Sequence, residues 1–304
     1  MRDNGAGDPG EATGILYAGI AYAVWGVMPV YWHLLDTVPP FELTTHRVLW
    51  CALFVTAVAA WRGRLAHIVT IVRTPPLLAT LALTSVLIGA NWSLFIYCVA
   101  TNQLVESSLG YYMTPLLSIV LGVFLFGERM SRLRLAGVVL AAAAVVVQAV
   151  ALGHVPWIGL ALALSFGFYG YFRKRAPVDS LDGLLVEMAI LFPLTLGLIL
   201  YWAVTQPGAF PSSNVMRDAL LMGAGPMTAI PLVLFAAGVR RIRLTTLGFL
   251  QYLSPSITLV LATVGYHERF TRIDAISFGC VWAALAIVAL EGRVNRFARM
   301  PGGD

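Results

Sequence analysis

The chain has 304 residues, of which 59% are apolar and only 12% are charged, with a net charge of +5. Soluble domains carry roughly a quarter charged residues, so this composition excludes a solvated globular domain and a disordered chain. A helix needs roughly 20 apolar residues to cross a bilayer. Ten such helices would use roughly 200 residues and leave about 100 for loops and tails. We therefore predict an all-α membrane protein with no folded soluble domain.

Ten apolar segments, separated by short polar or proline-rich breaks, are the predicted membrane spans. They are residues 15–35, 42–61, 77–100, 105–126, 133–152, 157–173, 183–204, 218–238, 244–266 and 274–291. The segment 157–173 is at the lower length limit for a span. Residues 1–14 have no basic region before a short apolar run, so we interpret them as a cytoplasmic tail and not as a cleaved signal. Residues 292–304 are interpreted as a basic cytoplasmic tail.

The distribution of lysine and arginine predicts the orientation of these spans. With a cytoplasmic N-terminus, sixteen of the 20 basic residues lie in cytoplasmic segments and three lie outside. The cytoplasmic set is Arg2, Arg62, Arg64, Arg73, Arg129, Arg132, Arg134, Arg173, Lys174, Arg175, Arg240, Arg241, Arg243, Arg293, Arg296 and Arg299, and the outer set is Arg217, Arg269 and Arg272. Cytoplasmic loops are enriched in basic residues, so both termini are predicted to be cytoplasmic.

A shift of 140 residues aligns residues 94–132 with residues 234–272 without a gap. It places Pro115 on Pro255, Tyr112 on Tyr252, and Glu128-Arg129 on Glu268-Arg269. Each half, 15–152 and 157–291, then holds five predicted spans. An odd number of spans requires the two halves to enter the membrane in opposite directions. Inverted repeats are typical of secondary transporters with alternating access.

Six segments in the two halves carry recognisable sequence. They are 21–32 (AYAVWGVMPVYW), 42–50 (ELTTHRVLW), 91–99 (NWSLFIYCV), 106–129 (ESSLGYYMTPLLSIVLGVFLFGER), 164–175 (LSFGFYGYFRKR) and 241–255 (RIRLTTLGFLQYLSP). These segments resemble the drug/metabolite transporter superfamily, specifically a pair of EamA-type domains of the RarD group, over about residues 15–291. The resemblance implies ten helices and an inner-membrane exporter or permease of small metabolites. RarD members are commonly labelled chloramphenicol-sensitivity proteins, a label that does not establish a substrate.

Arg47, in the second predicted span, is the one basic residue that belongs to neither the cytoplasmic nor the outer set. An ionisable group inside a membrane is costly, so Arg47 is a candidate functional residue whose partner must be found. Three roles remain open: an ion pair with Glu106, contact with an anionic substrate group, and snorkelling to the surface. The neighbouring His46 suits proton coupling because of its near-neutral pKa, although a hydrogen-bonded core position is the simpler interpretation.

Two proline-containing segments occupy matching positions in the two halves. Pro115 and Pro255 each remove a backbone N–H and free the carbonyl oxygen four residues earlier. Matched helix breaks favour a transport site lined by these free backbone groups, whereas a kink that only shapes packing is the alternative. The preferred lining residues are Tyr111, Tyr112, Gln251 and Tyr252.

Further candidates are polar or aromatic residues within the spans. Asn91 and Trp92 lie well inside the third span, where the amide contacts either a ligand or a neighbouring helix. Tyr22, Trp25 and Tyr169 are candidates for aromatic walls around a planar or amphipathic substrate. In the turns, Glu128 with Arg129 and Glu268 with Arg269 are predicted to form structural ion pairs.

Missing motifs narrow the function further. The sequence contains no GxxxxGK[ST], HExxH or GxSxG motif, and Cys51, Cys98 and Cys280 are scattered. We therefore predict no ATP-driven pump, no enzyme, no cofactor and no metal. The leading hypothesis is a secondary transporter of small metabolites, amino acids or drug-like molecules, and the alternatives are a channel and a non-transporting membrane sensor or assembly protein. The expected partners are the substrate and the lipid bilayer, with a homodimer left open and no nucleic acid.

Overall fold

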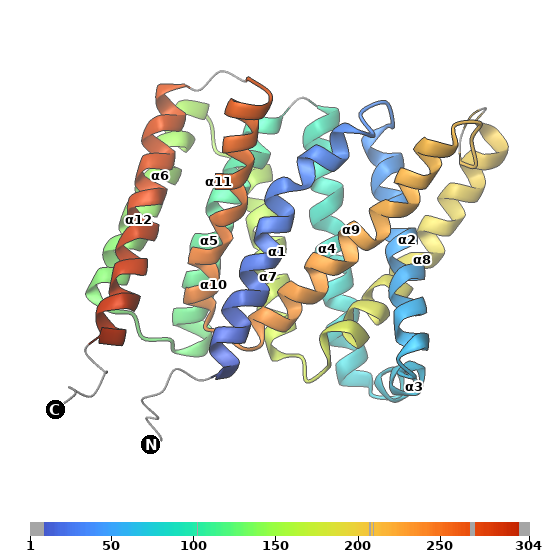
Figure 1. The fold of residues 1–304 in the computed structure, drawn as a ribbon, viewed down its shortest axis with the longest axis horizontal. Coiled ribbons are helices and arrows are strands. Elements are labelled where there is room, and N and C mark those ends of the chain that lie inside the picture. Colours follow the sequence, from blue (N-terminus) through green and yellow to red (C-terminus); the bar gives the residue numbers. More distant parts are fainter. Residues whose placement is uncertain (1–8, 102, 207, 209, 268–270, 298–304) are drawn as a thin grey trace.

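The computed structural model describes residues 9–101, 103–206, 208, 210–267 and 271–297. Every regular element among these residues is a helix, and the long helices stand side by side in one bundle (Figure 1). The described chain therefore has the all-helical class that its composition predicts.

The first half of the chain forms six helices. They are α1 (Pro9–His33), α2 (Pro40–Trp61), α3 (Leu65–Val72), α4 (Pro75–Ala100), α5 (Leu104–Phe126) and α6 (Arg132–Leu152). Proline begins α2 and α4, where its missing N–H costs no helical hydrogen bond. The short helix α3 was not expected, because its residues lie in a predicted polar break.

The second half forms six α-helices and one π-helical turn. They are α7 (Trp157–Arg175), α8 (Ser180–Thr205), α9 (Val215–Val239), α10 (Leu244–Gln251), α11 (Leu253–Val260), η1 (Leu261–Gly265) and α12 (Arg272–Phe297). Side-chain caps begin α8 and α9. The Asp179 carboxylate accepts a hydrogen bond from the Leu181 N–H, and the Asn214 side-chain oxygen accepts one from the Arg217 N–H.

Nine of the described helical segments are long and apolar enough to cross a membrane. Helix α7 is not among them, since it has 19 residues and its last turn carries Arg173, Lys174 and Arg175. It packs against α4, α5 and α9, so neighbouring protein surrounds much of its length. The structure thus supports a multi-pass membrane protein with nine candidate spans among the residues that it describes.

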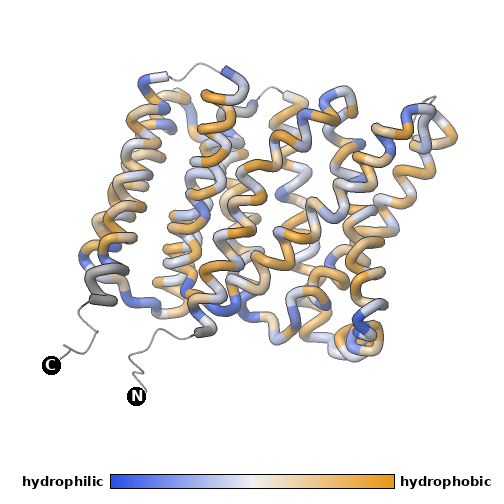
Figure 2. The backbone as a smooth tube through the Cα atoms, viewed as in Figure 1, coloured by the Kyte–Doolittle hydropathy of each residue, from blue (hydrophilic) through white to orange (hydrophobic). Residues whose placement is uncertain are grey.

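The bundle has two ends that differ in their turns. One, called here the Arg64 end, carries the α2–α3, α7–α8 and α9–α10 turns, and the other, the Arg217 end, carries the α1–α2 and α8–α9 turns (Figure 1). Hydrophilic residues concentrate at both ends, and apolar residues cover the middle of the helices (Figure 2). This pattern suits a protein whose central band contacts lipid.

Helix packing divides the bundle into a centre and two edges. Helices α6 and α12 pair at one edge and α2 and α8 at the other, while α1, α5, α7, α9 and α10 meet in between (Figure 1). Small residues permit close approach: a side chain on Gly248 of α10 would lie 2.6 Å from the Pro115 carbonyl oxygen of α5. Such small-residue contacts let helix backbones pack tightly within lipid.

The expected matching helix breaks occur in only one half. Helix α5 runs unbroken through Pro115, whereas the equivalent segment of the second half is divided at Tyr252, between α10 and α11. The prediction of a break at Pro115 is therefore wrong. A proline in a long helix removes one hydrogen bond, and packing of α5 against α7 and α10 holds the helix together around it.

Candidate substrate-binding site

Arg47 lies about 10 Å along α2 from the start of that helix, at a rise of about 1.5 Å per residue. Its Nε donates a hydrogen bond of 3.2 Å to the Thr228 hydroxyl of α9. The guanidinium carbon lies 4.6 Å from the ring centroid of Trp32 in α1 and 5.4 Å from that of Trp92 in α4. These four residues form what we call the Arg47 cluster.

The terminal nitrogens of Arg47 remain available within this cluster. Among the described residues only Nε makes a hydrogen bond, and the side chain is half-buried. Tyr111 of α5 lies within electrostatic range of the guanidinium. A guanidinium that keeps two amino groups free while its face lies near two indole rings can bind a planar anionic group.

The expected ion pair between Arg47 and Glu106 is wrong for the described structure. The Glu106 carboxylate instead accepts the Ile158 N–H at 3.0 Å, at the start of α7, and lies 3.7 Å from His154. A carboxylate at a helix N-terminus satisfies a free backbone donor and the helix dipole. Glu106 therefore stabilises the start of α7, and no carboxylate among the described residues pairs with Arg47.

His46 belongs to a different group at the Arg217 end. Its Nδ1 accepts a hydrogen bond of 3.2 Å from the Trp50 indole, and its ring packs on Phe210 at 5.1 Å between centroids. Glu42, one turn earlier, lies 4.0 Å from His46 Nε2 and 3.1 Å from Arg217 of α9. These contacts tie the start of α2 to α9 and place His46 in a packed, buried position.

Asn91 and Trp92 are adjacent in sequence but serve different neighbours. The Asn91 amide nitrogen donates to the Leu162 carbonyl at 3.0 Å and to the Ser165 hydroxyl at 2.9 Å, both on α7. Because the amide nitrogen already has two partners, Asn91 joins α4 to α7, and only Trp92 reaches Arg47.

An aromatic cluster occupies the interface of α1, α7 and α9. It contains the predicted residues Tyr22, Trp25 and Tyr169, packed around Phe235, with Tyr169 and Phe235 stacked at 5.8 Å. The buried side chains of Tyr22 and Gln251 lie close to each other, within hydrogen-bonding range. Gln251 therefore contacts the aromatic cluster through Tyr22.

Tyr112 and Tyr252 lie apart from the Arg47 cluster. Both are buried, their ring centroids are 6.4 Å apart, and Tyr112 also packs on Phe278 of α12 at 5.3 Å. Tyr111 faces the other way and is 47% exposed. Of the two adjacent tyrosines, only Tyr111 is positioned to contribute to the Arg47 cluster.

Glu128 does not pair with its neighbour Arg129 in the described structure. Its two carboxylate oxygens accept the N–H groups of Leu244 and Thr245, at 2.7 and 2.8 Å. The prediction of an ion pair is therefore wrong for Glu128, which caps α10 because four N–H groups at a helix start need acceptors. Glu268 and Arg269 cannot be compared in this way, since Glu268 and Arg269 lie outside the described residues.

The sequence reasoning missed a fully buried ion pair. Arg173 of α7 lies 3.5 Å from Glu187 of α8, and neither side chain has exposed surface. The sequence places Arg173 in a cytoplasmic basic cluster at the end of the predicted span 157–173 and indicates no partner for it. The signal for the pair is Glu187, an acidic residue inside an apolar run, where an ionisable group is as costly as Arg47.

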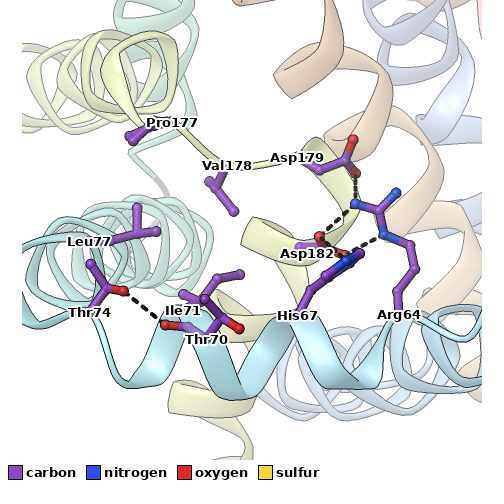
Figure 3. A pocket seen from close by; sticks show the side chains of 10 residues that line it. All are labelled: Arg64, His67, Thr70, Ile71, Thr74, Leu77, Pro177, Val178, Asp179 and Asp182. Carbon is purple, nitrogen blue, oxygen red and sulfur yellow. Dashed lines mark hydrogen bonds and ion pairs between the residues drawn. The ribbon is translucent and has the colours of Figure 1, made fainter.

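A pocket of about 320 Å³ lies at the Arg64 end, between α3 and the α7–α8 turn (Figure 3). Arg64 binds Asp182 through two hydrogen bonds of 2.9 and 2.7 Å, and His67 lies 3.8 Å from the same carboxylate. The bond to Asp182 raises the pKa of Arg64 above its ordinary value. The residues lining this pocket do not include the Arg47 cluster, so the pocket is a feature of the bundle end.

Two comparisons place the chain among known proteins. The model of the EamA-like transporter family matches residues 12–149 and again residues 155–290. The chain belongs to the EamA-like transporter family. This family is a transporter family, and the chain is accordingly a membrane transporter or permease of the RarD type.

Relatives of this EamA protein match along nearly its whole length. An uncharacterized transporter of Vibrio cholerae serotype O1 is 39% identical over 92% of both chains. Protein RarD of Salmonella typhimurium is 38% identical over 91% of this chain and 95% of its own. A solved crystal structure matches with a TM-score of 0.68 at 19% identity, covering 93% of this chain and 99% of the other, and supports the fold alone.

Proposed function

We propose that this EamA protein is a secondary transporter that exports small metabolites, amino acids or drug-like molecules by alternating access. The Arg47 cluster would bind the anionic group of the substrate, and the planar part of the substrate would pack on Trp32 or Trp92. The observation that carries this proposal is a guanidinium in the middle of α2 that lies beside two indole rings and whose two amino groups have no hydrogen-bond partner among the described residues.

A carboxylate is the anionic group that fits this arrangement best. Arginine binds carboxylates through two parallel hydrogen bonds, which need both terminal nitrogens or one of them with Nε. Within the part of the chain that the structure describes, only Nε of Arg47 makes a hydrogen bond, to a neutral hydroxyl that a substrate can replace. The aromatic neighbours favour an amphipathic substrate, because binding sites combine apolar walls with few polar groups.

The packing pattern supports two inverted five-helix halves. The 140-residue shift relates α4 to α9, α5 to α10 and α11, and α6 to α12, and by chain order α1 to α7. Helix α1 packs on α9 and α11, while α7 packs on α4 and α5, which are the related contacts with the halves exchanged. We infer that α7 is the tenth span, sheltered by its protein neighbours.

The proposed orientation places the Arg64 end in the cytoplasm of a bacterial-type cell. This end carries Arg64, Arg240, Arg241 and Arg243, in agreement with the bias of basic residues toward the cytoplasm. The two ends are held by different ion pairs, Arg64 with Asp182 at one and Arg217 with Glu42 at the other. Breaking one pair at a time would open the substrate site to one side of the membrane.

The proposal is tested by counterflow in proteoliposomes that contain the purified protein. The probes are radiolabelled aromatic and aliphatic amino acids, their amide analogues without a carboxylate, and chloramphenicol. Chloramphenicol is included because one relative in Pseudomonas aeruginosa is named chloramphenicol-sensitive protein RarD. We expect saturable uptake of carboxylate probes that is lost in Arg47→Ala and partly retained in Arg47→Lys. Arg241→Ala, at an exposed arginine of the Arg64 end, is the control.

Three results would contradict the proposal. Normal counterflow by a well-expressed Arg47→Ala protein would refute the role of Arg47. Equal transport of amides and carboxylates would refute the anionic site. Conductive flux that does not saturate would instead indicate a channel.

A further inference from the structure

The most deeply buried acidic group in the described bundle is Glu187. Its side chain has no exposed surface, and its carboxylate accepts hydrogen bonds from the Thr84 hydroxyl at 2.7 Å and the Tyr169 hydroxyl at 3.3 Å. The Ser85 hydroxyl donates a hydrogen bond of 2.7 Å to the backbone carbonyl of Glu187. Helices α4, α7 and α8 therefore meet at this one carboxylate.

Arg173 faces Glu187 but is poorly satisfied. Its Nε lies 3.5 Å from the carboxylate, its Nη2 donates to the Ser180 carbonyl at 3.1 Å, and Nε and Nη1 have no hydrogen-bond partner among the described residues. The guanidinium of Arg173 lies against Gly183, where a Cβ would meet Nη1 at its present position. An ion pair buried with so few hydrogen bonds is poised to separate, because desolvation is not fully offset.

The other titratable groups near this pair are few. Tyr169 and Arg173 face Glu187 from α7, and Cys51 faces it from α2. Helix α4 contributes the hydroxyls of Thr84 and Ser85, which do not titrate. At the end of α9, Arg240 lies within electrostatic range of Arg173. Asp179, which precedes α8, lies within electrostatic range of Arg240, and Glu187 is the one carboxylate that the described contacts place against Arg173.

We propose that Glu187 is the site that binds the coupling ion of the transport cycle, and that this ion is a proton. The inference rests on the proposed function and names its driving ion. The groups around the carboxylate are two hydroxyl donors and a guanidinium, which stabilise an ionised carboxylate. A sodium ion would need several oxygen acceptors in place of these donors.

Binding of the proton would also change the structure of the Arg64 end. A proton from water bonds to a Glu187 carboxylate oxygen, giving a neutral carboxylic acid, and Arg173 keeps its positive charge without a counter-ion. A buried, unpaired guanidinium is strongly unfavourable, so Arg173 is drawn toward water at the Arg64 end. Because Arg173 holds the first residue of α8 through Ser180, its movement would loosen the turn that carries Asp182.

The test is a substrate-free infrared titration of the purified full chain in lipid. Acidification is expected to produce a carboxylic acid C=O band that is absent in Glu187→Gln and present in Glu187→Asp. Tyr169→Phe, which removes one donor, should shift the band without abolishing it. Glu106→Gln changes another buried glutamate and should leave this band in place. Adding sodium at fixed pH should have no effect.

A second measurement tests the movement. Hydrogen exchange of the peptide around residues 180–188, with labelling times scaled to the intrinsic rate at each pH, is expected to be severalfold faster in acid for the wild type. In Glu187→Gln it should be equally fast at both pH values. A band that persists in Glu187→Gln, a sodium response, or exchange that is independent of pH in the wild type would each overturn the inference. These three results concern Glu187 only. Counterflow of carboxylates is a separate measurement, and its absence would refute the proposed function without bearing on the protonation of Glu187.

Discussion

The Tyr252 hydroxyl donates a hydrogen bond of 3.1 Å to the backbone carbonyl of Tyr112, the residue 140 positions earlier. Both tyrosines are buried, and their rings pack at 6.4 Å. The bond joins α5 to the break between α10 and α11. The 140-residue shift relates α5 to this α10–α11 segment. The bond therefore links equivalent positions of the two halves directly.

Removing this hydroxyl should weaken the contact between the halves. We expect Tyr252→Phe to lower the free energy of unfolding by about 1 kcal/mol, because one buried hydrogen bond is lost without a change of shape. Thermal unfolding in detergent, followed by circular dichroism, measures the effect. Tyr201→Phe is the control, since Tyr201 is 59% exposed. Equal melting temperatures for the two variants would refute the prediction.

Glu128 should stabilise the start of α10 through its charge. Glu128→Gln keeps the size of the side chain but weakens both hydrogen bonds to Leu244 and Thr245, and we expect a loss of about 1 kcal/mol in unfolding free energy. Arg129→Gln should have little effect, because Arg129 is not the partner of Glu128. A larger loss for Arg129→Gln would restore the ion pair that the sequence suggested.

The Arg64–Asp182 pair should keep the Arg64 end closed. In a chain lacking its three native cysteines, Ile71→Cys places a thiol at a buried position lining the Arg64 pocket. We expect Asp182→Asn to speed maleimide labelling of this thiol severalfold. The raised pKa of Arg64 keeps its guanidinium charged. The ratio of the labelling rates with and without Asp182→Asn, compared at the same pH, should therefore be the same between about pH 6 and 8.

The control for this labelling experiment is Asp218→Asn, which changes an acidic residue near the opposite end of the bundle. Its labelling rate should match that of the unmodified background. If Asp182→Asn and Asp218→Asn label at the same rate, the pair does not close the Arg64 end.

Reporter fusions can establish the membrane topology. A periplasm-active reporter inserted in the 205–217 loop should be active, and a cytoplasm-active reporter after residue 304 should also be active. This outcome follows from the bias of sixteen basic residues toward one side and from an even number of spans. A cytoplasmic 205–217 loop or an external C-terminus would exclude the proposed inverted arrangement.

The sequence predicted the long helices well because each is an apolar run bounded by charge or proline. Helix α4, for example, begins at Pro75 and ends at Ala100, and the predicted span was 77–100. It could not predict α3, because eight residues between two spans carry too short a pattern. Nor could it predict that α5 stays unbroken at Pro115, which depends on packing by helices distant in the chain.

The candidate site was predicted less completely than the fold. Arg47 and Trp92 were identified because polar and aromatic groups stand out in an apolar run, and the structure brings them together. Their partners could not be predicted, since the rotation of each helix decides whether Arg47 meets Glu106 or Thr228. Glu187 was not predicted, because its partner Arg173 belongs to a basic cluster that is typical of a cytoplasmic loop.

The weak apolar character of α7 has a consequence for how the chain is made. A segment that ends in three basic residues partitions poorly into lipid by itself, but α4 and α5 offer it a protein surface that is synthesised earlier. The first half would then act as a template on which the second half inserts. Biogenesis of this protein would accordingly depend on the order in which the ribosome delivers its helices, and a separately expressed second half would need the first half to enter the membrane.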